Sequence, residues 1–197
     1  KLTSFGLEVE SKVFPGDISD EAFKKEFAAI NADALVDGIL MLRPLPKQIN
    51  EQDIEKMIDP AKDLDGISPV NIAKVFSGDT SGFAPCTAEA VVCMLKMNDI
   101  ALSGKRVAVV GRSMVVGRPL SMLLLHENAT VTICHSRTAN LPEVCREADI
   151  LTACVGKAAM IDHTYVKKDA VVIDVGINVD ENGKLCGDVD FADLEGT

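Results

Sequence analysis

Short apolar runs alternate with helical patterns in the second half of the chain. The runs are rich in β-branched residues, as buried parallel strands are, and they span residues 107–110, 130–134, 150–155 and 170–175. Helical patterns over residues 120–125 and 141–147 lie between the first three runs. This alternation predicts a parallel sheet with helices on both faces, followed by a turn at 180–183 and a last strand over 185–189.

The pattern in the first half is less regular and predicts short strands and helices. Residues 1–5 have the pattern of a helix end that Gly6 closes, and residues 7–14 alternate as a half-buried strand does. Residues 36–42 predict another strand, which ends at Arg43-Pro44-Leu45-Pro46 because two prolines exclude regular structure. We place the boundary between two domains near residues 98–104, with domains 1–99 and 100–197.

Helices are predicted over residues 17–30, 50–58 and 87–97, each from a polar residue that suits an N-cap. The candidate caps are Ser19 or Asp20, Asn50 and Thr87. Residues 60–69 predict a loop, in which Lys62 and Asp63 are interpreted as a surface pair.

The turn after residue 110 carries the strongest functional pattern. Gly111 follows a predicted strand, and Gly117 opens a predicted helix, whose N-terminus can hold a pyrophosphate. The next strand ends at His135-Ser136-Arg137-Thr138, where a dinucleotide fold meets the adenosine ribose. Hydroxyls and a cation there favour the 2′-phosphate of NADP over NAD. The glycine spacing departs from G-x-G-x-x-G, so a nucleotide-free unit of the same fold stays open.

Composition removes several classes of function. The formal net charge of −10 argues against nucleic acid or an anionic membrane as partner, and no run is apolar enough to span a bilayer. The six cysteines form no C-x-x-C pair and no cluster with histidine, so we predict no metal site and a reducing, cytoplasmic setting. No signal peptide is visible, and the start at Lys1 suggests a fragment or a trimmed chain.

Seven motifs occur in one order along the chain. They are DGILMLRPLP (37–46), KDLDG (62–66), GFAPCT (82–87), VGRS-x-x-VG-x-P (110–119), CHSRT (134–138), DVGIN (174–178) and GDVDF (187–191). Together they resemble the bifunctional methylenetetrahydrofolate dehydrogenase/cyclohydrolase family over essentially the whole chain.

The resemblance implies a fold and an activity. It implies two α/β domains with a folate cleft between them, the C-terminal one a Rossmann-like parallel sheet that binds NADP. The dehydrogenase step would oxidise 5,10-methylenetetrahydrofolate to the methenyl cation, and the cyclohydrolase step would open that cation to 10-formyltetrahydrofolate. A homodimer joined through the Rossmann domain, and a place in one-carbon metabolism that supports purine biosynthesis, are further implications.

The resemblance also assigns residues. Asp65 matches the acid that hydrogen-bonds the pterin, whereas its local sequence alone would favour an Asx-turn. Leu42 and Pro44 fall at substrate positions. Arg112 and Ser136 match the positions near the 2′-phosphate. The other cofactor positions are Gly111, Ser113, Gly117, His135, Arg137 and Ile177.

Two departures from the family pattern matter. The family's catalytic Tyr and Lys, in a Y-V-x-x-K helix, match positions before Lys1, and a P-G-G-V-G-P segment falls beyond Thr197. The family's strand reads G-I-L-V-Q-L-P-L-P, whereas Leu42 here stands at the Gln of the hydrolytic apparatus and Arg43 follows it. Adjacent strand residues face opposite sides, so Arg43 could substitute only if the strand ends before it. We therefore hypothesise an impaired or rebuilt cyclohydrolase.

Two other readings remain open at this stage. One is another two-domain NADP oxidoreductase, acting on shikimate or an amino acid, which would share the Rossmann half without the RPLP, KDLDG and PCT motifs. The other is a degenerate or binding-only chain that holds folate or nucleotide without turnover.

Overall fold

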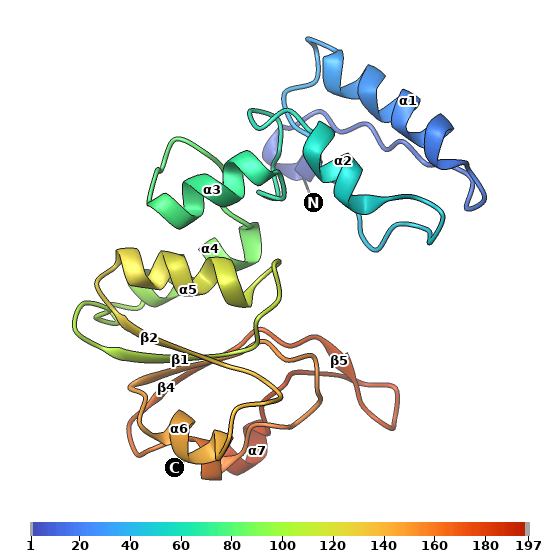
Figure 1. Ribbon diagram of the computed structural model, residues 1–197. Coiled ribbons are helices and arrows are strands. Elements are labelled where there is room, and N and C mark those ends of the chain that lie inside the picture. Colours follow the sequence, from blue (N-terminus) through green and yellow to red (C-terminus); the bar gives the residue numbers. More distant parts are fainter. Residues whose placement is uncertain (1, 196–197) are drawn as a thin grey trace.

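The computed structural model describes residues 2–195 and shows a helical N-terminal region beside a region built on a parallel sheet (Figure 1). The N-terminal region holds η1 (Leu2–Phe5), α1 (Asp20–Ala32), α2 (Glu51–Met57) and α3 (Pro69–Ser77). The sheet region holds α4 (Cys86–Met97), α5 (Gly117–His126), α6 (Leu141–Arg146), η2 (His163–Tyr165) and α7 (Phe191–Leu194), with the strands described next.

Four parallel strands form the main sheet in the order β2-β1-β3-β4. They are β1 (Arg106–Val110), β2 (Thr130–Cys134), β3 (Ile150–Ala153) and β4 (Val171–Asp174). β1 and β3 are buried apart from Arg106, because both lie between neighbouring strands and under helices. The mixed α/β class and the parallel sheet predicted from the apolar runs are confirmed.

Helices cover both faces of this sheet (Figure 1). On one face α4 and α5 pack over alternate strand residues, including Val107, Val109 and Ile150. On the other face α6 and the segment around η2 pack over the intervening residues, including Ala108, Val110 and Leu151. α4 therefore shares the core of the sheet, although it precedes the domain boundary predicted near residues 98–104.

The order of the strands creates a switch point between β1 and β3. The chain leaves β1 through α5 to reach β2 on one side, and then crosses through α6 to β3 on the other side. Loops at the carboxyl ends of β1 and β3 consequently diverge, which leaves a crevice where this class of sheet binds ligands. Gly111 stands at this point, directly after β1.

The two strands predicted in the N-terminal region are wrong. Residues 7–14 are irregular and mostly exposed, with no partner strand among the described residues. In residues 36–42 only Ile39 pairs, through a single parallel bridge to Asp63. A strand needs a neighbour for its backbone groups, and the sequence pattern does not show whether one is present. This region is instead held by an apolar core of α1, α2 and the intervening loops, with Phe23, Phe27 and Ile54 buried.

Helix starts were predicted with mixed success. Ser19 caps α1, since its hydroxyl accepts from Ala22 N at 3.2 Å. Asn50 stands at the N-cap of α2 without a side-chain hydrogen bond. The Thr87 cap is wrong, because α4 begins at Cys86 and Pro85 occupies the N-cap. The predicted end of a helix at Gly6 is a 3₁₀ turn in the described residues; Lys1 lies outside them.

α3 was missed, although its sequence carries both end signals. Ser68 accepts from Asn71 N at the start, Pro69 follows at the first turn, and Gly78 closes the helix in the left-handed conformation (φ 77°). The last predicted strand shrinks to a two-residue strand in a hairpin, β5 (Asn178–Val179) with β6 (Leu185–Cys186). No helix in residues 2–195 has the length and apolar character to cross a membrane.

Candidate functional site

The loop after Ile39 places both Leu42 and Arg43 in the wall of the site, but only the Arg43 side chain is largely buried there. Leu42 is 81% exposed, whereas the Arg43 side chain is 19% exposed and points toward carboxylates of α2 and of the following loop. The loop has no regular strand geometry here, and a cis peptide bond joins Arg43 to Pro44. The predicted strand therefore ends before Arg43, which was the condition under which Arg43 could take the place of the family's Gln.

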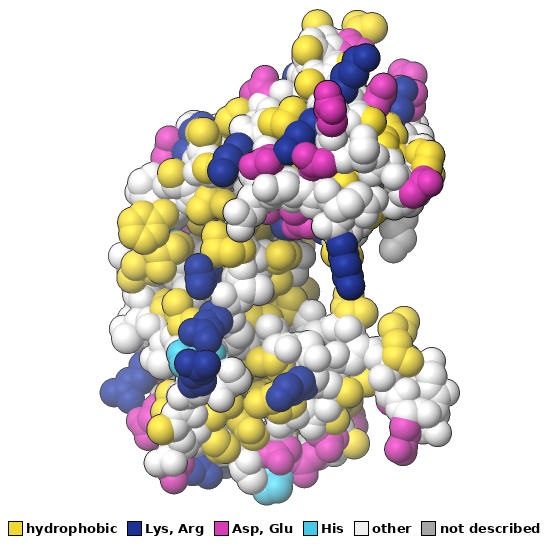
Figure 2. Space-filling model, turned by 45° about the vertical axis from the view of Figure 1, so that its right-hand side comes forward, with side chains coloured by type: hydrophobic (Ala, Val, Ile, Leu, Met, Phe, Trp, Pro, Cys, Tyr) yellow, Lys and Arg dark blue, Asp and Glu magenta, His cyan; other side chains and the backbone are white. Residues whose placement is uncertain are grey.

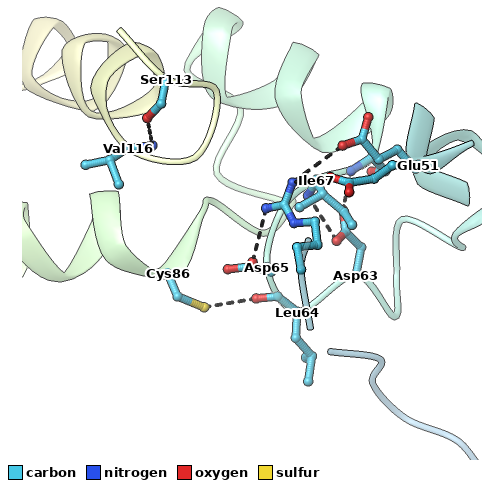
Figure 3. Close-up of polar contacts among 11 residues, drawn as sticks. Glu51, Asp63, Leu64, Asp65, Ile67, Cys86, Ser113 and Val116 are labelled. Atoms are coloured by element: carbon cyan, nitrogen blue, oxygen red, sulfur yellow. Dashed lines mark hydrogen bonds and ion pairs between the residues drawn. The ribbon is translucent and has the colours of Figure 1, made fainter. Parts of the chain in front are cut away.

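Three carboxylates surround the Arg43 guanidinium. Its Nη1 lies 3.5 Å from Glu51 Oε1 and 3.5 Å from Glu55 Oε1, and its Nη2 lies 3.6 Å from Asp65 Oδ2. The dashed lines in Figure 3 mark ion pairs that end on Glu51 and Asp65. Glu51 also accepts from Leu45 N at 3.4 Å, so α2 and the proline turn are joined at this point.

A buried aspartate shapes the loop that presents Asp65. Asp63 is fully buried and accepts hydrogen bonds from Ile67 N, Ser68 N and Asn71 Nδ2 at 2.8–3.0 Å. Lys62 donates instead to backbone oxygens of Asn31 and Asp33. The interpretation of Lys62 and Asp63 as a surface pair is therefore wrong, because Asp63 is buried and accepts from the backbone that leads into α3.

Gly66 lets this loop pass close to the segment before α4. Its φ is +61°, and a Cβ at this position would lie 2.7 Å from Phe83 O. Cys86 Sγ donates to Leu64 O at 3.1 Å across the same contact. Burial, followed by the charge of Asp65, raises the pKa of the Cys86 thiol. The KDLDG and GFAPCT motifs thus form one structural unit.

A groove runs between the N-terminal region and the start of α5. Its volume is about 400 Å³, and its walls comprise Leu40, Met41, Leu42, Arg43, Pro44, Glu51, Asp65 and Val115. A smaller cavity of about 60 Å³ lies beside it, also bounded by Arg43, Asp65 and Val115. Figure 2 shows a face that is hollowed between the upper and lower parts of the molecule. The predicted substrate positions Leu42, Pro44 and Asp65 all line this groove.

The glycine turn after β1 is a close backbone contact. Gly111 has φ +135°, and a Cβ there would lie 2.3 Å from Cys154 O, at the end of the neighbouring β3. A Cβ on Gly117 would lie 2.2 Å from Gly111 O, so the two glycines pack against each other. Ser113 Oγ accepts from Val116 N at 3.1 Å, which organises the start of α5. Arg112 and Ser113 are exposed.

The loop after β2 lies beside this turn. Val110 and Cys134 are paired strand residues, and Gly111 N donates to Cys134 O at 2.9 Å. Arg112 and the 135–138 loop therefore start from neighbouring strand ends. The His135 ring accepts from Arg137 N at 3.1 Å, and Thr138 Oγ1 accepts from His135 N at 2.9 Å. Ser136 and Arg137 are exposed, so the structure brings the predicted 2′-phosphate residues to one edge of the sheet.

Ile177 lies apart from that group. It follows β4, which is separated from β1 by β3, and it is 84% exposed. The predicted cofactor residues therefore fall on two sides of the switch point, with His135, Ser136 and Arg137 on one side and Ile177 on the other. An extended dinucleotide would have to reach across the carboxyl ends of the strands to meet both.

Asp188 holds the loops after β3 and β4 together. It is fully buried and accepts from Val155 N, Gly156 N and Lys157 N at 2.6–3.1 Å, and from Asn178 Nδ2 at 2.9 Å. Burial alone would raise the pKa of Asp188, but these hydrogen bonds hold it below its usual value.

Asp174 adds the second half of the same loop network. It ends β4 and accepts from Gly176 N, Asp188 N and Val189 N at 2.9–3.0 Å. The DVGIN and GDVDF motifs therefore fix the backbone on both sides of Ile177.

Sequence reasoning missed several of these residues. Glu51 and Glu55 belong to a short helix with no motif, and nothing in the pattern marks them as partners of Arg43. Asp188 lies in a motif that the resemblance includes, but its burial shows only in the fold. Met114 and Val115 line the cavities from the glycine turn, and their exposure at 46% and 40% was not predictable from an apolar pair.

One cluster lies away from this site. Asp162, His163 and Asp193 have ligand atoms within 4.8 Å of one another. The His163 ring is hydrogen-bonded to Asp193 at 2.7 Å, which raises the pKa of His163. The sequence predicted no metal site here; His163 is exposed, and the two aspartates are half-buried.

The fold and the site define a Rossmann-type α/β protein with a groove beside its switch point. The family model for the catalytic domain of tetrahydrofolate dehydrogenase/cyclohydrolase matches residues 1–65, and that for the NAD(P)-binding domain matches residues 85–197. The bifunctional protein FolD of Clostridium kluyveri is 54% identical over 97% of this chain and 67% of its own length. FolD of Carboxydothermus hydrogenoformans is also 54% identical, over 98% and 68%.

Solved structures agree with these matches. The bifunctional FolD enzyme of Campylobacter jejuni superposes with a TM-score of 0.89 at 38% identity, over 91% of this chain and 64% of that one. The Trypanosoma brucei FolD complexed with NADP cofactor and inhibitor gives 0.83 at 33% identity, over 90% and 63%. The chain belongs to the tetrahydrofolate dehydrogenase/cyclohydrolase family, and it spans about two thirds of the length of these relatives.

Proposed function

We propose that this protein oxidises 5,10-methylenetetrahydrofolate to 5,10-methenyltetrahydrofolate with NADP as the oxidant. The observation that carries the proposal is the placement of Asp65 and the glycine turn on one groove. Asp65 and Val115 both line it, so a folate held by Asp65 would lie next to a cofactor held at the switch point. Family membership supports the same chemistry.

The residues at the carboxyl ends of the strands fit NADP. Gly111 and Gly117 allow a tight backbone turn without side chains, and no acidic residue stands in the 135–138 loop, where NAD-binding proteins place a carboxylate for the 2′-hydroxyl. We assign the 2′-phosphate to Arg112 and Ser136, with His135 and Arg137 beside them and Ser113 at the turn. Ile177 would contact the other end of the cofactor.

Asp65 suits the pterin end of the substrate. A carboxylate can accept from two ring N–H groups at once, and the Asp65 side chain is 24% exposed at the groove. Pro44 and Leu42 provide apolar surface on the same wall.

The proposed step balances as a hydride transfer. When it is bound, NADP⁺ supplies the acceptor for one hydride from the methylene carbon. The folate loses two electrons and one hydrogen, so its bridge becomes a methenyl cation. The work of the protein is to orient both partners and to exclude water from the groove.

We further propose that the hydrolytic half of the family's chemistry is impaired or rebuilt. Leu42 stands where the family has Gln, and its side chain can neither donate nor accept a hydrogen bond. Arg43 is the polar side chain beside it in the same wall, and its guanidinium can only donate hydrogen bonds. Hydrolysis of 5,10-methenyltetrahydrofolate at the rate of Gln-containing relatives would contradict this proposal.

The cellular setting follows from the same assignment. We propose a cytoplasmic homodimer that acts in one-carbon metabolism and supports purine biosynthesis. The exposed side chains of Ile133 on the edge strand β2 and of Leu125 on α5, which contacts β2, support pairing of two copies through the sheet region.

Calorimetric titration with NADP and with tetrahydrofolate tests the assignment against its alternatives. The proposal predicts that NADP and tetrahydrofolate both bind. Neither ligand should weaken the affinity of the protein for the other. Tight NADP binding with no folate response would favour another two-domain NADP oxidoreductase, of shikimate or amino-acid type. Binding of both without turnover in the full-length protein would favour a binding-only or degenerate chain.

A further inference from the structure

We propose that Arg43 is a positioning residue that holds the Asp65 carboxylate at the folate groove. This inference rests on the proposed function, because it takes Asp65 as the group that receives the pterin. The family pattern has Leu at the position of Arg43. A leucine cannot form an ion pair with Asp65, so this role would be particular to chains with Arg43.

The first argument is contact. Arg43 Nη2 lies 3.6 Å from Asp65 Oδ2, and among the described residues no other cation lies within ion-pair distance of Asp65. Asp65 follows the bridge between Ile39 and Asp63, on a loop that Asp63 shapes. Asp63 fixes the backbone of this loop, whereas the Asp65 side chain is ion-paired with Arg43.

The second argument is the anchoring of Arg43 itself. Glu51 and Glu55, both on α2, form ion pairs with Nη1 of Arg43. These contacts fix the guanidinium on one side, and Nη2 faces Asp65 on the other. Burial raises the pKa of Glu55, although the charge of Arg43 opposes that rise. A planar guanidinium with several donors suits this bridging geometry better than a lysine ammonium does.

The third argument is location. Arg43 and Asp65 line both the groove of about 400 Å³ and the smaller cavity of about 60 Å³. The ion pair therefore forms part of the surface that a ligand would meet, rather than a contact inside the apolar core. One guanidinium and three carboxylates also leave the cluster with an excess of negative charge. Arg43 is thus committed to its carboxylates and does not offer a free anion site.

A double-mutant cycle on tetrahydrofolate binding tests the proposal. The variants are Arg43→Leu, Asp65→Asn and the double variant, measured by calorimetry in the full-length protein. We expect each single change to weaken tetrahydrofolate binding about ten-fold, the loss of one charge-assisted contact, with NADP affinity unchanged. The double variant should be no weaker than Asp65→Asn alone, because Arg43 acts through Asp65.

Control variants separate positioning from general stability. Arg106→Leu removes an exposed arginine that pairs with Glu147, far from the groove, and should leave both affinities unchanged. Arg43→Lys should bind folate more tightly than Arg43→Leu, because lysine keeps the positive charge although it lacks the planar guanidinium with its several donors. If Arg43→Leu does not fold, Arg43→Lys replaces it in the same cycle.

The outcomes are distinguishable. Losses that multiply in the double variant, or a folate affinity that Arg43→Leu leaves within two-fold of wild type, would overturn the role of Arg43 while the proposed function stands. Failure of the wild-type protein to bind tetrahydrofolate would overturn the proposed function, and the Arg43 proposal with it.

Discussion

At the scale of single residues, two adjacent positions decide what the groove can do. Both residues line the groove, but the Leu42 side chain is mostly exposed, whereas the Arg43 side chain is largely buried against Asp65. The sequence showed that both positions depart from the family pattern. It could not show which of the two side chains faces the site, because that depends on a loop with no regular strand.

Restoring the family residue at position 42 should affect hydrolysis alone. Leu42 is 81% exposed, so Leu42→Gln costs little packing and returns a donor and an acceptor to the groove. We expect a faster hydrolysis of 5,10-methenyltetrahydrofolate, with oxidation of the methylene compound unchanged. Steady-state assays of both half-reactions measure this, with Leu42→Met as the matched apolar control. An equal rate for both variants would argue that Arg43 or another group already serves hydrolysis.

Arg112 should discriminate between the two nicotinamide cofactors. It is exposed at a strand end beside Ser136, so its charge is available to a 2′-phosphate. Arg112→Ala should weaken NADP binding by roughly 1.5–3 kcal/mol, about ten-fold to a hundred-fold, and should leave NAD binding nearly unchanged. Calorimetry with each cofactor gives the comparison, with Arg146→Ala on the exposed side of α6 as control. Equal losses for NADP and NAD would refute the phosphate assignment.

At the scale of elements, the sequence predicted the sheet region well and the N-terminal region poorly. β1 to β4 were visible without tertiary information because each is a short run rich in β-branched residues, although only β1 and β3 are buried along most of their length. Residues 7–14 and 36–42 have a strand-like pattern, but their pairing depends on partners that a local pattern does not specify. The glycine turn and the 135–138 loop were placed correctly because they follow directly from strand ends. The Arg43 cluster was not predicted, since it joins three separate segments.

The loops after β3 and β4 should depend on Asp188. Asp188→Ala would leave three backbone N–H groups and Asn178 without their acceptor, so we expect a loss of at least about 2 kcal/mol in the free energy of unfolding. Denaturant unfolding at neutral pH measures it. Glu181→Ala, on the exposed turn between β5 and β6, is the control and should change stability little.

The same residue gives stability a dependence on pH. The pKa of Asp188 is lowered in the folded state, so the unfolded chain binds its proton more readily. The contribution of Asp188 is therefore complete at neutral pH and is lost as pH falls below about 3.9 toward the folded value. As pH falls across this acid range, the free energy of unfolding should decrease more steeply for the wild type than for Asp188→Ala. Parallel curves would contradict the role assigned to the carboxylate.

At the scale of the whole molecule, the groove exists because two regions with separate cores meet at it. The sheet region contributes Val115 and the cofactor turn, and the N-terminal region contributes Arg43 and Asp65. Neither region alone brings folate and nucleotide positions together. This arrangement explains why the motifs that define the family are spread along the whole chain.

The proposed dimer can be tested separately from activity. β2 is an edge strand whose Ile133 is 38% exposed, and Leu125 on α5, which contacts β2, is 51% exposed. Light scattering should give the mass of two copies, and Leu125→Glu combined with Ile133→Lys should give that of one. A monomeric wild type at micromolar concentration would contradict the dimer and leave the site unaffected.

The most direct test of the central claim is the initial rate of 5,10-methylenetetrahydrofolate oxidation by the full-length protein, with NADP⁺ and with NAD⁺ as alternative acceptors. We predict turnover that forms one NADPH for each methenyl product, prefers NADP⁺, and falls in Asp65→Asn. Binding of both ligands without any oxidation, or oxidation that Asp65→Asn leaves unchanged, would contradict it.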